Sequence, residues 1–120
     1  MEKISNNQLA SLKISRDVIA TVSRVAAYEI EGVVSLSERP GNLKGFFSKG
    51  LSRPIEINLT DDFAEIDICL CLEYGAIIPD VCTAVQANIK DNVQTMTGIV
   101  VSKVNVTVAE ITFSKQREEQ

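Results

Sequence analysis

The stretch Phe63–Tyr74, FAEIDICLCLEY, alternates between apolar side chains and side chains that are acidic or carry a thiol. One row contains Ile66, Ile68, Leu70, Leu72 and Tyr74, and the other contains Glu65, Asp67, Cys69, Cys71 and Glu73. Successive side chains of a β-strand point to opposite faces of its sheet, so a period of two is typical of a strand with one face in the core. The stretch therefore predicts a long strand whose apolar row is buried.

The preceding stretch, Pro54–Leu59, alternates in the same way and predicts a neighbouring strand. Asp61-Asp62 lies between the two runs, and aspartate is favoured in tight turns. A two-residue loop at this point brings the apolar faces of both strands to the same side, which makes the register self-consistent. The expected pairs are Leu59 with Ala64 and Ile57 with Ile66.

Two helices are predicted from apolar residues that recur with the helical period. The first covers Arg16–Glu31, with Ser15 as its N-cap and Gly32 as its C-cap. The second begins at Pro79 and ends before Gly98. The expected core-facing residues are Val18, Val22, Val25 and Ala26 in the first helix, and Val81, Val85, Ile89, Val93 and Met96 in the second.

Three further strands complete the predicted fold: Leu9–Lys13, Val33–Leu36 and Ile99–Ile111, the last with Val100, Val104, Val106 and Val108 on one face. The order β-α-β-β-β-α-β predicts an α/β (α+β two-layer) fold, with one mixed sheet and two helices packed on one face. We expect residues 1–120 to form a single domain, with a core over about 9–111 and a polar tail over 112–120. The other sheet face would carry Glu56, Asn58, Cys69, Cys71, Val101 and Thr107, and its exposure favours self-association.

The composition argues against several classes of function. The chain has no histidine, which removes the commonest general base and metal ligand. Its net charge of −4 disfavours nucleic-acid binding, and Gly41–Gly45 reads G-x-x-x-G rather than the G-x-x-G of a KH module. We find no secretory signal and no apolar run of membrane-spanning length, so we expect a cytoplasmic protein without a membrane span.

The three cysteines offer a weak case for metal or redox chemistry. Cys69 and Cys71 share a strand face, and Cys82 follows in the second helix. Structural zinc sites normally have four ligands, and this set falls short. We therefore expect reduced thiols on a partly covered sheet face, with no cofactor and no metal.

The segment Glu38–Arg53, called the basic segment below, has four basic residues and one acidic residue, a net charge of +3. Phe46-Phe47 lies in its middle. Basic residues around exposed aromatic rings are typical of a docking surface. The competing interpretation is that both rings pack against the edge of the core. The candidate partner-docking residues are Arg39, Lys44, Phe46, Phe47, Lys49 and Arg53.

Several segments taken in order resemble the alkaline shock protein family, the envelope-stress and general stress proteins of Gram-positive bacteria. The matching segments are Ile14-Ser15-Arg16-Asp17-Val18-Ile19, Glu31-Gly32-Val33-Val34, Leu72-Glu73-Tyr74-Gly75, Val85-Gln86, Met96-Thr97-Gly98 and Val104-Asn105-Val106. They span about residues 9–111. Each motif alone is weak, whereas the ordered set is fairly specific.

The resemblance implies a non-enzymatic cytoplasmic protein of cell-envelope homeostasis that acts through protein–protein interaction. It also implies self-association, and recruitment to the membrane by a separate anchor protein. The alternative is an accessory protein of fatty-acid or phospholipid synthesis, because some members are similar to proteins encoded beside fatty-acid kinase or acetyl-CoA carboxylase genes. An uncharacterised enzyme is a third reading. The family offers no catalytic residues to carry over.

Overall fold

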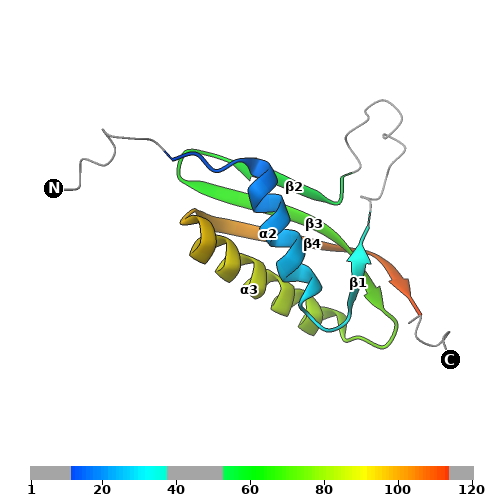
Figure 1. Ribbon diagram of the computed structural model, residues 1–120. Helices are drawn as coiled ribbons and strands as arrows, with labels where there is room; N and C mark the ends of the chain where they lie inside the picture. Colours follow the sequence, from blue (N-terminus) through cyan, green and yellow to red (C-terminus); the bar gives the residue numbers. More distant parts are fainter. Residues whose placement is uncertain (1–11, 38–52, 114–120) are drawn as a thin grey trace.

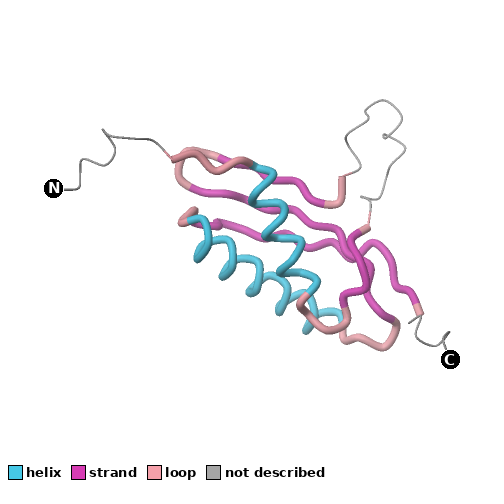
Figure 2. Tube along the Cα trace, viewed as in Figure 1, coloured by secondary structure: helices cyan, strands magenta, loops and turns pink. Residues whose placement is uncertain are grey.

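The computed structural model describes residues 12–37 and 53–113, which form two helices and a four-stranded sheet (Figure 1). The elements in chain order are α2 (Arg16–Tyr28), β1 (Val33–Leu36), β2 (Ile55–Leu59), β3 (Phe63–Glu73), α3 (Ile78–Thr97) and β4 (Val100–Thr112). Both helices lie on the same face of the sheet (Figure 2). This arrangement confirms the predicted α/β (α+β two-layer) fold with one mixed sheet.

Strand β3 is the centre of the sheet because every other strand pairs with it. β4 runs parallel to β3 along its whole length, from Phe63 opposite Val100 to Glu73 opposite Thr112. β2 is antiparallel to the first half of β3, and β1 is antiparallel to the second half. Since β4 occupies one edge completely, β1 and β2 share the other edge, one after the other.

The β2–β3 hairpin has the predicted register, with Leu59 opposite Ala64 and Ile57 opposite Ile66. Its turn is closed by Thr60, whose N–H donates to the carbonyl of Phe63 at 2.9 Å. The apolar row of β3 is also where it was predicted, since Ile66, Ile68, Leu70 and Leu72 are at most 1% exposed. Tyr74 does not continue this row, because it is 65% exposed.

The predicted strand Leu9–Lys13 is not found where it can be checked. Leu12 and Lys13 lie in a loop, and residues 9–11 fall outside the described part of the chain. The first helix also ends earlier than predicted, at Tyr28. Gly32, with φ +102°, is not the residue that caps it but belongs to the turn that leads into β1.

The buried face of α2 differs from the predicted one. The buried residues are Ile19, Val22, Ser23, Ala26 and Ala27, whereas Val18 is 46% and Val25 is 53% exposed. The prediction passed over Ser23 because a hydroxyl is usually costly to bury. Here the Ser23 Oγ donates to the carbonyl of Ile19 at 2.8 Å, so the hydroxyl has a partner within the helix. The helix is therefore rotated from the predicted face.

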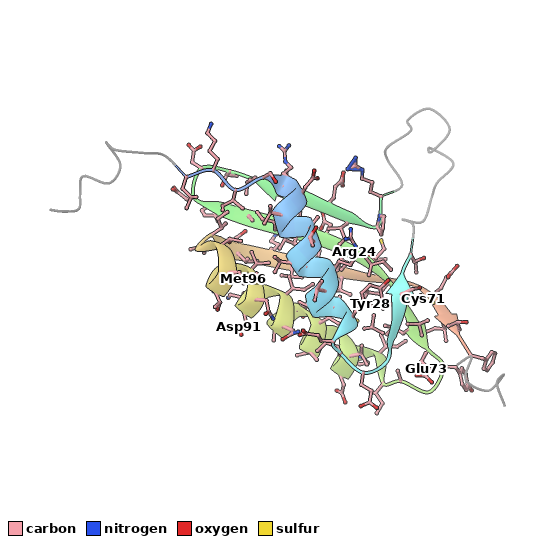
Figure 3. All side chains as sticks on the ribbon, in the orientation of Figure 1. Arg24, Tyr28, Cys71, Glu73, Asp91 and Met96 are labelled. Carbon is pink, nitrogen blue, oxygen red and sulfur yellow. The ribbon has the colours of Figure 1, made fainter. Side chains whose placement is uncertain are left out.

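Helix α3 follows its prediction more closely. Val81, Val85, Ile89 and Val93 are buried, and Gly98 is a left-handed C-cap with φ +78°. Met96 is an exception at 68% exposed, because it lies in the last turn of the helix, past the buried stripe. Figure 3 shows Met96 at the end of α3 that lies away from the β3–α3 turn.

One residue of β4 alters which side chains face the helices. The register with β3 shifts between Ala64 and Glu65, where β4 passes from Val101 to Lys103 and leaves Ser102 as an extra residue. Such a β-bulge reverses the alternation on its far side. Val101 is consequently buried under the helices at 2% exposed, and Val100 is 55% exposed, the reverse of the prediction for both.

Candidate interaction surfaces

The predicted docking residues lie mostly outside the described part of the chain. Arg39, Lys44, Phe46, Phe47 and Lys49 fall there, and Arg53 is exposed beside β2. The attachment points of the basic segment are nevertheless defined. The Ser37 N–H donates to the Cys69 carbonyl, and the Cys69 N–H donates to the Pro54 carbonyl, each at 2.9 Å. The segment therefore leaves the β1/β2 edge of the sheet and returns to it at the same level of β3.

Arg53 lines two hollows beside the start of α2. One has a volume of about 690 Å³ and the other about 240 Å³, and Arg16 and Asp17 line both. The first also contacts Asp61, and the second contacts Glu56. The walls thus mix basic and acidic side chains, which suits solvated charges and does not match a nucleophile, a general base and an oxyanion site.

The sheet face opposite the helices is polar over its first half. Glu65, Asp67 and Lys103 lie on it in neighbouring strands, as the register with β4 requires. The Asn105 side-chain amide donates to Glu65 at 3.1 Å and to Asp67 at 2.7 Å. This row contains the predicted residues Glu56, Asn58 and Thr107 but not Val101. A polar row disfavours self-association by apolar packing across this part of the face.

Cys69 and Cys71 are buried, at 1% and 4% exposed, rather than partly covered as predicted. Figure 3 places Cys71 on β3 behind β1. Cys82 is half-buried in α3, and burial raises the pKa of its thiol. Among residues 12–37 and 53–113, no disulfide joins these cysteines, and no group of three His, Cys, Asp or Glu side chains could hold a metal ion.

We expect the three thiols to react with iodoacetamide in two classes. Cys82 should be alkylated first in the native protein, slowly at neutral pH and faster as the pH rises, because its raised pKa keeps it protonated. Cys69 and Cys71 should react at least about 100-fold more slowly, since the core must open before reagent reaches them. Peptide mass spectrometry measures each rate, and denatured protein is the control. Equal rates in the native state would contradict the burial of the pair.

A group of exposed apolar side chains lies where β3 and β4 end and α3 begins. The exposed fractions are Tyr74 65%, Ile77 62%, Ile78 41%, Ile111 45% and Phe113 68%. The Tyr74 N–H donates to the Thr112 carbonyl at 2.7 Å, and the rings of Tyr74 and Phe113 are 4.9 Å apart. We call these five residues the end surface. Sequence analysis missed it because Tyr74 continues the apolar row of β3 and Phe113 was assigned to the tail.

Comparison with known families decides what kind of protein carries these surfaces. A family model for the alkaline shock protein 23 family, described as having a cell envelope-related function, matches residues 4–113. The chain belongs to this family. The resemblance seen in the sequence motifs is thereby confirmed over nearly the whole chain.

Relatives of the alkaline shock protein 23 family member span similar lengths. YqhY of Bacillus subtilis is 26% identical over 116 residues, covering 95% of this chain and 86% of the relative. Spy1614 of Streptococcus pyogenes serotype M6 is 29% identical over 110 residues, covering 88% and 91%. YloU of Bacillus subtilis is 28% identical over 101 residues, covering 81% and 84%. All three are named as uncharacterized proteins, so they extend the family assignment and add no activity.

Solved structures with the same fold are variants of the MamM CTD. A doubly substituted variant has a TM-score of 0.56 at 12% identity, covering 84% of this chain and 97% of that chain. A singly substituted variant has a TM-score of 0.51 at 8% identity, covering 80% and 99%. Identities this low support the fold alone. Within the described residues, no helix of this family member is long and apolar enough to cross a bilayer.

Proposed function

We propose that this member of the alkaline shock protein 23 family acts in cell-envelope homeostasis as a binding protein, without catalysis of its own. The family assignment supports the envelope role. The observation that carries the binding role is the end surface, where five large apolar side chains remain exposed beside a well-packed core. Exposed apolar groups of this size on a soluble domain typically mark contact sites for other proteins.

The basic segment is the proposed element that keeps the protein at the membrane through a membrane-bound partner. Its net charge of +3 contrasts with the acidic surface of the rest of the chain, whose overall net charge is −4. The segment projects from one point on the β1/β2 edge, where both of its ends are hydrogen-bonded to Cys69. Such a placement presents the charges to a partner while the fold remains anchored behind them.

Charge reversal of the basic segment tests this role. Changing Lys44, Lys49 and Arg53 to Glu should release most of the protein from membrane fractions of the producing cells, because charge-assisted contacts of exposed groups lose their attraction. The matched control changes three exposed basic residues elsewhere, Lys13, Lys90 and Lys103, to Glu. The control should fractionate as the wild type does.

The amount of membrane-bound protein is read by immunoblot, and circular dichroism verifies that each variant folds. Equal retention of the segment variant and the wild type would exclude the segment as the docking element. Pull-down with the wild type then separates the two functional readings. Membrane proteins as the specific partners support the proposal, and an enzyme of fatty-acid or phospholipid synthesis as the specific partner would replace it with the accessory role.

A further inference from the structure

The end surface is surrounded by negative charge. Glu73 and Glu110 lie at the same end of the sheet, and Asp80 is in the first turn of α3. Glu31 precedes Gly32, whose carbonyl accepts from the Glu73 N–H at 2.8 Å. No Lys or Arg occurs in the described ranges 25–37, 54–89 and 104–113. In Figure 3, Glu73 marks this acidic end, opposite the end that carries Met96.

An apolar surface with an acidic surround selects its occupant by chemistry. Aromatic and aliphatic groups bury against Tyr74 and Phe113, whereas basic groups pair with the carboxylates. An anionic lipid surface is disfavoured because it repels the acids. The chain's tail, SKQREEQ, has no apolar side chain to bury. The required occupant is a segment with large apolar side chains flanked by Lys or Arg.

The chain itself contains such a segment. In the basic segment, Phe46-Phe47 is flanked by Lys44 and Lys49, with Arg39 and Arg53 further out. The segment is attached to the β1/β2 edge of β3, whereas Ile111 and Phe113 belong to β4 on the opposite edge. A contact within one chain would have to cross the sheet, and a contact between two chains would not.

We propose that the end surface of one copy binds the basic segment of a second copy. This inference rests on the proposed function, because it assigns an occupant to the surface that carries the binding role. The contact joins two different patches, so each copy keeps one unused end surface or one unused segment. Heterologous contacts of this kind extend into open chains unless their rotation closes a ring. The unused segment at one end of a chain remains available to the membrane-bound partner.

Two complementary variants test the contact. The segment variant carries Phe46→Ser and Phe47→Ser, and the end variant carries Tyr74→Ser and Phe113→Ser. The control variant carries Val18→Ser and Val25→Ser, which are also exposed apolar residues but lie on α2. Sedimentation velocity over a range of concentrations measures self-association, and thermal unfolding verifies that each variant folds.

We expect concentration-dependent assemblies for the wild type and the control, and a loss of association of about tenfold or more for each complementary variant. An equimolar mixture of the two complementary variants should recover dimers but no larger species. Only one intact surface of each kind is then present per pair. Recovery of pairs without longer assemblies is specific to a heterologous contact.

Several results would overturn the proposal: a wild type that stays monomeric, complementary variants that associate as the wild type does, or a mixture that remains monomeric. Fractionation separates this failure from failure of the proposed function. The end variant keeps its basic segment, so it should remain with membranes while being monomeric in solution. A monomeric wild type that still fractionates with membranes would remove the self-contact and leave the envelope role intact.

Discussion

Truncating Leu70 to Ala is expected to lower the free energy of unfolding by about 2–5 kcal/mol, because the site cannot collapse around the space that is left. Leu70 is 0% exposed and lies on the central strand. It is paired with Leu36 on one side and Val108 on the other. Four neighbouring residues of the row, from Ile66 to Leu72 on the helix-facing side, are buried with it under α2 and α3.

Chemical denaturation monitored by circular dichroism measures this loss. Val100→Ala is a suitable control, since Val100 is on the same sheet but 55% exposed. The control should cost less than about 1 kcal/mol, as surface substitutions usually do. A Leu70→Ala protein with an unchanged midpoint would show that the helix-facing row is not the core. A large loss in the control would show that the bulge at Ser102 is misplaced.

Gly32→Ala is expected to destabilise the fold by about 2–4 kcal/mol through two separate effects. Gly32 has φ +102°, a conformation that costs a residue with a Cβ about 1–3 kcal/mol. A Cβ at this position would also lie 3.0 Å from Val81 Cγ2 and 3.3 Å from Ala76 Cβ. Val81 is a buried residue of α3, so it cannot move away without disturbing the packing between helix and sheet.

Gly75→Ala separates the two effects. Gly75 has nearly the same backbone angle, φ +99°, but no described atom lies within 4 Å of a Cβ placed there. Its substitution should therefore show the backbone cost alone, about 1–2 kcal/mol. The two free energies of unfolding are compared by denaturation under the same conditions. Equal losses for the two variants would mean that the turn before β1 does not press against α3.

The structure also relates surface character to position in the fold. Negative charge and exposed apolar groups gather at the end of the sheet near the β3–α3 turn, whereas the basic segment leaves the β1/β2 edge. Opposite charges on separate parts of one chain favour ordered contacts between copies over random aggregation. The predicted self-association through the sheet face has less support, because Asn105 ties two carboxylates into a polar row there.

Periodicity by itself determined the parts of this protein that depend on near neighbours in the chain. The alternation in β3, the register of the β2–β3 hairpin and the buried stripe of α3 all follow from side-chain direction along a single element. The ordered motifs likewise carried the family assignment, which the match over residues 4–113 confirms. Composition contributed the acidic charge and the lack of histidine, both independent of folding.

Only the tertiary structure decided features that depend on contacts between distant residues. The bulge at Ser102 arises from pairing with β3, so it inverted Val100 and Val101 without any local signal. The rotation of α2 followed from packing that accepts the self-satisfied hydroxyl of Ser23. The end surface exists because the strands extend past the helices, where Tyr74 and Phe113 meet across two strand ends. Burial is a property of the whole assembly of elements, and one-dimensional periodicity does not contain it.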